Sequence, residues 1–441
     1  MPEQPALSAS GGLDDPAPSG GPTPESGGTG AQGARLPSLF RQRAFRGLWV
    51  GSVASSIGSS AGLLAINWLV YTATGSAFDL ALVGVAGTVP RVIFGVFSGA
   101  LADRYSKLRL MIVADMFRAA TMVAFAVTLA TLGFSLYVVL AAVFILGLGQ
   151  SLFRPSINSF LPQAVSKEQL GSANGLFTAA QEAASVIGSP VGGILVAAVG
   201  VAATLAVNGA SYVASAVMIV LVSVSLASVG RPAAAERSER PTFVEQLKGG
   251  FAYVNGERGL LKLTLASFGA NFFLSLFFTF LVVYVDSVLH QSALFYGILG
   301  AAGGAGFSMG SLLVGRLHPE RRFGVWFALP WGLVGVGIIA FALFPVAALS
   351  PIILFVSTAF GGFGNTTFFT GVQSFVPRDL LGRYLSIDEV GSVAASPAGQ
   401  IAGGLIIASY GLGVDYILAG LGTAAFALSL LLFSDVRSLQ V

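Results

Sequence analysis

Seven charged side chains interrupt the long apolar runs of this 441-residue chain. A charge at the centre of a bilayer costs roughly 2.5–3.5 kcal/mol on insertion scales, so such residues usually face a cavity or a partner. The acidic members could carry protons, and the basic members could pair with acids or bind anionic groups. The seven are Arg91, Asp115, Arg118, Arg154, Glu182, Asp388 and Glu389.

Glu182 is the leading candidate for proton exchange, because it lies about half-way along its apolar run. A carboxyl group in a cavity of low dielectric can exchange protons near neutral pH. Arg91 is similarly deep in another run and is a candidate partner. The alternative is a permanent salt bridge from Glu182 to Arg91 or Arg118 that only holds helices together.

The remaining acids allow two interpretations. Asp388 and Glu389 lie nearer the end of their run. They could form an inner gate with Arg91 or Arg154 and take part in proton coupling, or they could simply meet water.

Asp115 and Arg118 are three residues apart, which places them on one face of a helix. We interpret these two residues as a structural ion pair.

The composition indicates that lipid, not water, surrounds these runs. Hydrophobic residues make up 54% of the chain and charged residues only 10%, whereas soluble proteins carry roughly 25% charged residues. A helix needs about 20 mostly apolar residues to cross a bilayer. With no Cys and two His, the chain offers no thiolate or histidine metal site, and no cofactor is expected. It also lacks a Gly-Lys-Ser/Thr phosphate loop, so ATP is not expected to drive it.

Apolar runs between polar breaks predict twelve membrane-spanning helices, and hence an all-α integral membrane protein. They lie near residues 45–71, 77–101, 108–132, 135–161, 172–198, 201–228, 260–287, 292–315, 322–345, 350–375, 383–409 and 413–434.

Four segments are expected from this pattern. Residues 1–39, rich in Pro, Gly and Ser, predict a disordered tail. Residues 40–228 and 260–441 each hold six spans. The segment 229–259 between them predicts a linker with an amphipathic surface helix over 241–254.

Lys and Arg cluster on every second connection. Arg104, Lys107 and Arg109 follow the second span, whereas the connections near 72–76, 133–134 and 199–200 carry neither residue type. Such asymmetry places the basic side in the cytoplasm. Both termini and the middle linker are therefore expected to be cytoplasmic, in a multi-pass protein of the inner (plasma) membrane.

The two halves echo each other. QEAASVIGSP at 181–190 and DEVGSVAASP at 388–397 share five of ten positions, in the fifth and eleventh spans. SFLP at 159–162 matches SFVP at 374–377. Related halves that rock around a central site are the alternating-access design of secondary transporters.

The segment GALADRYSKLR at 99–109 resembles the signature loop of the major facilitator superfamily, Gly-x-Leu-Ala-Asp-Arg-x-Gly-Arg/Lys, with Ser106 in place of the second Gly. The segment 153–176 is similar to members that export macrolides and enterobactin. The resemblance covers roughly residues 40–435. It implies two pseudo-symmetric six-helix bundles that move a small molecule.

The resemblance also implies roles for single residues. Asp103 and Arg104, with Gly99, would form a cytoplasmic gate with Arg383 at the start of the eleventh span. Drug/proton antiporters of the superfamily usually carry an Arg in the fourth span, where LAAVFILGLGQS at 140–151 has no charge.

Spans that line the cavity in this fold are polar and aromatic here, which suits a bulky amphipathic ligand. The candidates for contact with substrate are Asn67, Gln150, Asn271, Asn365, Phe272 and Phe368. The Gly-rich span at 297–315 is interpreted as a packing and sliding surface.

The expected function is proton-coupled export of a hydrophobic or amphipathic small molecule from the cytoplasm by a secondary active transporter, not an enzyme. The alternatives are an importer or uncoupled facilitator of the same fold, and, in a different class, a non-transporting membrane sensor. The expected partners are the lipid bilayer, the small-molecule substrate and protons, without nucleic acid, and a monomer is expected.

Overall fold

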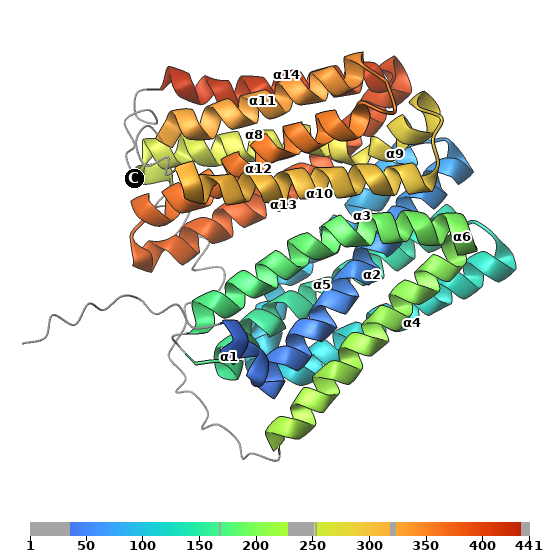
Figure 1. Cartoon of the computed structure of the whole chain (residues 1–441), viewed down its shortest axis with the longest axis vertical. Coiled ribbons are helices and arrows are strands. Elements are labelled where there is room, and N and C mark those ends of the chain that lie inside the picture. The colour runs from blue at the N-terminus through green and yellow to red at the C-terminus, as the bar shows by residue number, and fades with distance from the viewer. Residues whose placement is uncertain (1–35, 167–168, 228–250, 252–253, 318–322, 434–441) are drawn as a thin grey trace, which may run out of the picture.

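A computed structural model describes residues 36–166, 169–227, 251, 254–317 and 323–433 (Figure 1). Most of the tail and of the 229–259 linker, including nearly all of the amphipathic helix expected over 241–254, lies outside these residues. The segment 36–39, expected to belong to the tail, is part of a short helix. Leu39 is buried there beside Phe45.

Regular structure in the described residues is entirely helical. Lipid offers no hydrogen-bond partners, so a chain that crosses a membrane must pair its own backbone groups, and a helix does so. The long helices are α2 (Arg43–Thr74), α3 (Ala77–Arg104), α4 (Lys107–Leu132), α5 (Leu136–Ala164), α6 (Leu170–Ala227), α8 (Arg258–Thr279), α10 (Ala293–Leu317), α11 (Phe323–Leu343), α12 (Ser350–Phe375), α13 (Arg378–Tyr410) and α14 (Leu412–Ser429). Shorter pieces are α1 (Leu36–Arg41), α9 (Leu281–Val283), η2 (Tyr284–Val288) and η3 (Leu430–Leu432).

These helices follow the predicted spans closely. In the described residues, ten helices are long and apolar enough to cross a membrane. α6 counts once among them, although Gly200 adopts φ 82° and breaks it into two helices. α13, with 33 residues, is not among the ten. Both features support the twelve crossings, which stay a prediction.

The helices form two groups, seen in Figure 1 as a lower group from blue to green and an upper group from yellow to red. In the lower group α2 and α4 pack on α6, and α3 packs on α5. In the upper group α10 packs on α12, α11 on α14, and α8 on α13. The first group is called the N bundle and the second the C bundle below.

The two bundles meet mainly through α6 against α10 and α3 against α13. A Cβ atom on Gly193 would lie 3.0 Å from Leu294 Cα, and one on Gly297 would lie 3.0 Å from Pro190 Cα. Small residues of this kind let helix backbones approach closely. Tyr71 Oη and Ser287 Oγ, 2.6 Å apart, add a hydrogen bond between the bundles.

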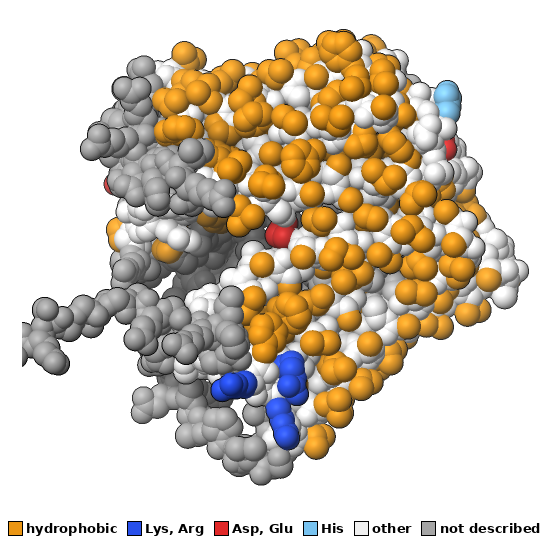
Figure 2. Space-filling model, in the orientation of Figure 1, with side chains coloured by type: hydrophobic (Ala, Val, Ile, Leu, Met, Phe, Trp, Pro, Cys, Tyr) orange, Lys and Arg blue, Asp and Glu red, His pale blue; other side chains and the backbone are white. Residues whose placement is uncertain are grey.

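These contacts gather toward one end of the molecule. Gly193 precedes the break at Gly200, and Ser287 and Leu294 flank the connection between η2 and α10. The bundles are therefore closed together at the end that carries these connections. Figure 2 shows the hollow between them at the opposite end, at the left of the view.

Within the C bundle, α10 presents a row of glycines to α12. A Cβ on Gly310 would collide with the backbone carbonyl of Ala359, and one on Gly306 with that of Phe355. The interpretation of 297–315 as a packing surface is confirmed. Its sliding role stays a prediction.

We expect Gly297→Val to separate the bundles at their closed end. The added side chain would meet the backbone of Ser189 and Pro190, and overpacking of this kind costs about 1–3 kcal/mol. Spin labels at Val199→Cys and Phe344→Cys, each 56% exposed in the parent chain, should report a longer distance across this end.

Gly413→Val is the matched control, because a Cβ there meets open space. An unchanged label distance in Gly297→Val would show that this contact does not hold the closed end together.

Candidate functional site

Two cavities lie between and within the bundles. The first, of about 660 Å³, is lined mainly by α2, α3, α5 and α6, and reaches Phe278 of α8 and Gln400 of α13. The second, of about 490 Å³, is lined by α8, α11, α12, α13 and α14. Arg154 of α5 lines both. The N-bundle cavity and the C-bundle cavity therefore share one basic lining residue.

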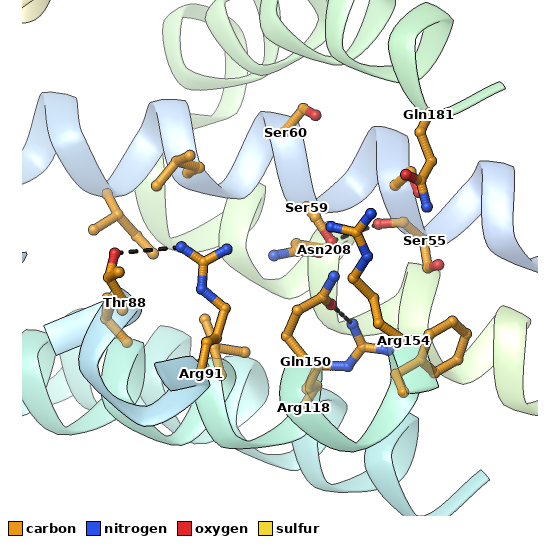
Figure 3. A pocket seen from close by; sticks show the side chains of 18 of the residues that line it. Ser55, Ser59, Ser60, Thr88, Arg91, Arg118, Gln150, Arg154, Gln181 and Asn208 are labelled. Carbon is orange, nitrogen blue, oxygen red and sulfur yellow. Dashed lines mark hydrogen bonds between the residues drawn. The ribbon is translucent and has the colours of Figure 1, made fainter. Parts of the chain in front are cut away.

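The first cavity has a polar wall built on α2. Its serines recur at the spacing of one helix face and are Ser52, Ser55, Ser56, Ser59 and Ser60. Ser59 Oγ lies 2.8 Å from Tyr212 Oη of α6. In Figure 3, Arg154 and Gln150 extend from α5 toward this serine face, so polar groups from two walls converge on the same space.

The predicted pair of Asp115 and Arg118 is confirmed, as a salt bridge in which both side chains are almost wholly buried. Arg118 also donates to Gln150 Oε1 at 2.8 Å. Its guanidinium carbon lies 4.7 Å from the ring centroid of Phe153 and 4.4 Å from that of Tyr212. One buried cation thus ties α4, α5 and α6 together behind the wall of the first cavity.

The second cavity has an aromatic wall, formed by Phe327 and Trp331 of α11 and by Phe368 and Phe369 of α12. The rings of Phe327 and Phe368 lie 5.6 Å apart between centroids. Such a surface suits an apolar or aromatic body.

Polar groups of the second cavity come from three helices. Asn271 donates to Ser392 Oγ at 3.2 Å, and Asn365 and Asp388 also face the cavity. Asp388 is 8% exposed.

The structure brings to these cavities seven of the nine predicted site residues whose side chains are described. Asn67, Gln150 and Arg91 line the first. Asn271, Asn365, Phe368 and Asp388 line the second. Asn67 lies 3.5 Å from Tyr296 Oη of α10, and Arg91 donates to Thr88 Oγ1 at 3.3 Å.

Two candidates lie elsewhere. Glu182 is exposed and is not among the described residues that line either cavity. Val186 and Ser189, one and two turns further along α6, face Gly304 and Gly300 of α10, so Glu182 lies near the seam between the bundles. Phe272 packs edge-on against Phe273, with centroids 5.1 Å apart, and is also outside both linings.

Five predicted residues have side chains outside the described set. They are Gly99, Asp103, Arg104, Arg383 and Glu389. Their helices are described, with α3 ending at Arg104 and α13 beginning at Arg378.

Several lining residues were missed. The serines of α2 had a sequence signal, since their period of three and four residues marks a polar face within an apolar run. Trp331, Asn208 and Gln181 had no such signal, because their contribution depends on how each helix is rotated against its neighbours.

Asp115→Asn is expected to destabilise the N bundle, because it leaves the Arg118 charge buried without its counter-ion. Removing one partner of a buried pair costs about 3–5 kcal/mol. The loss should appear as a lower thermal unfolding midpoint of the purified protein.

The double variant Asp115→Leu/Arg118→Met should recover most of that loss, since it removes both charges. A midpoint for the double variant at or below that of Asp115→Asn would show that the pair is not what stabilises the bundle.

Comparison with known proteins agrees with this architecture. A family model described as a transmembrane secretion effector, within the major facilitator group, matches residues 36–440. Macrolide efflux protein A of Streptococcus pyogenes is 24% identical over 410 residues, which cover 90% of this chain and 97% of that protein. Multidrug efflux pump Tap of Mycobacterium tuberculosis is 23% identical over 407 residues, covering 88% and 93%.

The fold is also found among solved structures. A bacterial homologue of the human lysosomal transporter Spinster, in an inward-facing and unoccupied conformation, aligns with a TM-score of 0.64 at 15% identity, over 91% of this chain and 96% of that one. Two helical bundles, cavities lined from both of them and the family match over nearly all described helices lead to one conclusion. The chain belongs to the transmembrane secretion effector family of major facilitator transporters, and is a secondary transporter rather than an enzyme.

Proposed function

We propose that this transporter exports a hydrophobic or amphipathic small molecule in exchange for protons. The observation that carries the proposal is the pair of cavities that share Arg154, between bundles whose described close contacts gather toward one end. Relatives named as efflux pumps support the outward direction.

The arrangement suggests how access would alternate. In the described conformation the seam between α6 and α10 closes one end, and the hollow opens at the other. Rocking of the bundles about the cavities would open the closed end and close the open one. The glycines of the seam suit such a movement, because backbones without side chains can part and meet again without repacking.

Asp388 is the proton carrier best supported by the geometry. It is the one acid among the described residues that line either cavity, and it shares the second cavity with Arg154. A binding event near Arg154 could therefore change the electrostatic environment of the Asp388 carboxyl directly. Glu182 is the second candidate, because its place near the α6–α10 seam would couple protonation to bundle movement. Arg91, in the first cavity, and Glu389, beside Asp388 in the chain, complete the candidate set.

The test uses liposomes that contain the protein and a pH-sensitive dye. The proton gradient is set so that protons tend to flow toward the cytoplasmic side of the protein. Amphipathic compounds, erythromycin and ethidium among them, are added one at a time, and at least one compound should trigger proton flux with the parent protein. Asp388→Asn should reduce that flux to the level of empty liposomes, whereas Glu257→Gln, at an exposed acid away from both cavities, should leave it unchanged.

Glu182→Gln run in parallel decides between the two acids. Substrate movement that ignores the proton gradient would indicate the alternative, an uncoupled facilitator. Accumulation in the opposite direction would indicate an importer.

We also propose that the protein lies in a bacterial plasma membrane, with its open end and both termini on the cytoplasmic side. The distribution of Lys and Arg along the chain supports this orientation. On the face seen in Figure 2, Lys and Arg side chains gather at the lower left, on the side of the hollow, and apolar side chains cover most of the rest.

The absence of Cys allows a direct test of orientation. Tyr105 and Tyr137, 61% and 85% exposed, lie beyond opposite ends of α4, a 26-residue helix about 39 Å long. A membrane-impermeant maleimide added to intact cells should label Tyr137→Cys and spare Tyr105→Cys until the cells are opened. The reverse pattern would invert the proposed topology.

A further inference from the structure

We infer that the substrate carries an anionic group, which Arg154 and its neighbours bind in the first cavity, on an apolar or aromatic body that lies in the second. The inference rests on the proposed transport function and names the class of molecule transported. It is argued from the charges, the donors and the shape of the joined cavities.

The balance of charge in the first cavity is positive. Its described lining contains three arginines, Arg91, Arg118 and Arg154, and no Asp or Glu. Asp115 neutralises Arg118 from behind the wall. Arg154 has no salt bridge among the described residues, and Asp388, an acid that lines the second cavity, does not line the first.

Arg154 is the centre of the site. It is exposed to the cavities, and no salt bridge to it is found in the described part of the chain. A guanidinium presents five donors in a planar fork that fits carboxylates, phosphates and related oxyanions. A charge within a membrane-spanning helix usually faces a cavity or a partner, and a ligand in the cavity could supply the counter-charge of Arg154.

Further donors surround this position. In Figure 3, Gln150, Gln181, Ser55 and Asn208 lie around the Arg154 side chain. The Gln150 amide oxygen already accepts from Arg118, which leaves its NH₂ group to donate. Hydroxyl and amide donors beside a guanidinium complete the coordination of an oxyanion.

The other end of the same space is aromatic. Phe327, Trp331 and Phe368 line the second cavity, which Arg154 shares. A molecule bound through its anionic group at Arg154 could therefore extend its apolar body toward these rings. A purely cationic ligand would place its charge beside the Arg154 guanidinium, which opposes its binding.

The test measures binding of three aromatic probes that share a naphthyl body. They are naphthalene-2-sulfonate, a permanent anion; naphthalene-2-sulfonamide, which is neutral; and 2-naphthyltrimethylammonium, a permanent cation. Equilibrium dialysis against protein in nanodiscs, corrected with empty nanodiscs, removes partition into lipid. We expect the sulfonate to bind about tenfold or more tightly than the sulfonamide, because of its charge-assisted hydrogen bonds, with the cation weakest.

Arg154→Gln should weaken binding of the sulfonate by about tenfold and change that of the sulfonamide little. Arg109→Gln, the same change at an exposed arginine of α4 outside both cavities, should alter neither. A Trp331→Ala variant should weaken all three probes alike, since it removes part of the shared aromatic wall. Thermal unfolding of each variant separates lost binding from lost folding.

Equal binding of the three probes, preference for the cation, no binding of any probe, or an Arg154→Gln variant that binds the sulfonate normally would each overturn the inference. Liposome transport of erythromycin or ethidium is scored separately. Proton-coupled transport of these compounds without sulfonate binding would leave the proposed function intact and refute only the anion site. Sulfonate binding without transport of any compound would support the anion site and contradict the proposed function.

Discussion

The rest of the structure depends on the close approach of two helix backbones, α6 of the N bundle and α10 of the C bundle. Gly193 and Gly297 have no side chains to keep these backbones apart, and the Tyr71–Ser287 hydrogen bond lies at the same end. Because the bundles touch here and diverge elsewhere, a space opens between them. A seam built on glycines and other small residues can also part and form again, which is what a transporter requires of the contact that closes one of its ends.

Charge inside the membrane is handled in two different ways. Arg118 is fixed by Asp115, Gln150 and two aromatic rings, and so belongs to the framework that supports the first cavity. Arg154, one turn after Gln150 on α5, faces the open space of both cavities. The framework cation and the ligand-facing cation are neighbours, so the buried pair also positions the wall from which Arg154 projects. Asp115 neutralises Arg118, and under the proposed function a ligand would neutralise Arg154. Both arrangements lower the free-energy cost of placing charge inside the membrane.

The sequence was sufficient to predict the helices, the turn at Gly200 and the Asp115–Arg118 pair, because hydropathy and helical spacing act along the chain. It also placed Asn271, Asn365 and Phe368 at a cavity. It did not predict that Glu182 lies outside the described linings of both cavities, nor that Arg154 lines both of them. Both depend on the rotation of a helix about its axis. Lipid and neighbouring helices are equally apolar, so a run such as 172–198 carries little information on which face meets which.

The connections at the closed end are short: two residues between α2 and α3, three between α4 and α5, and the single residue Gly200 within α6. Gly411 alone joins α13 to α14. Connections this short do not allow one helix to cross the bilayer while the next helix remains outside it. During synthesis the chain must therefore enter the membrane as successive hairpins, each delivered whole by the insertion machinery. The finished protein then presents few connecting residues at its closed end.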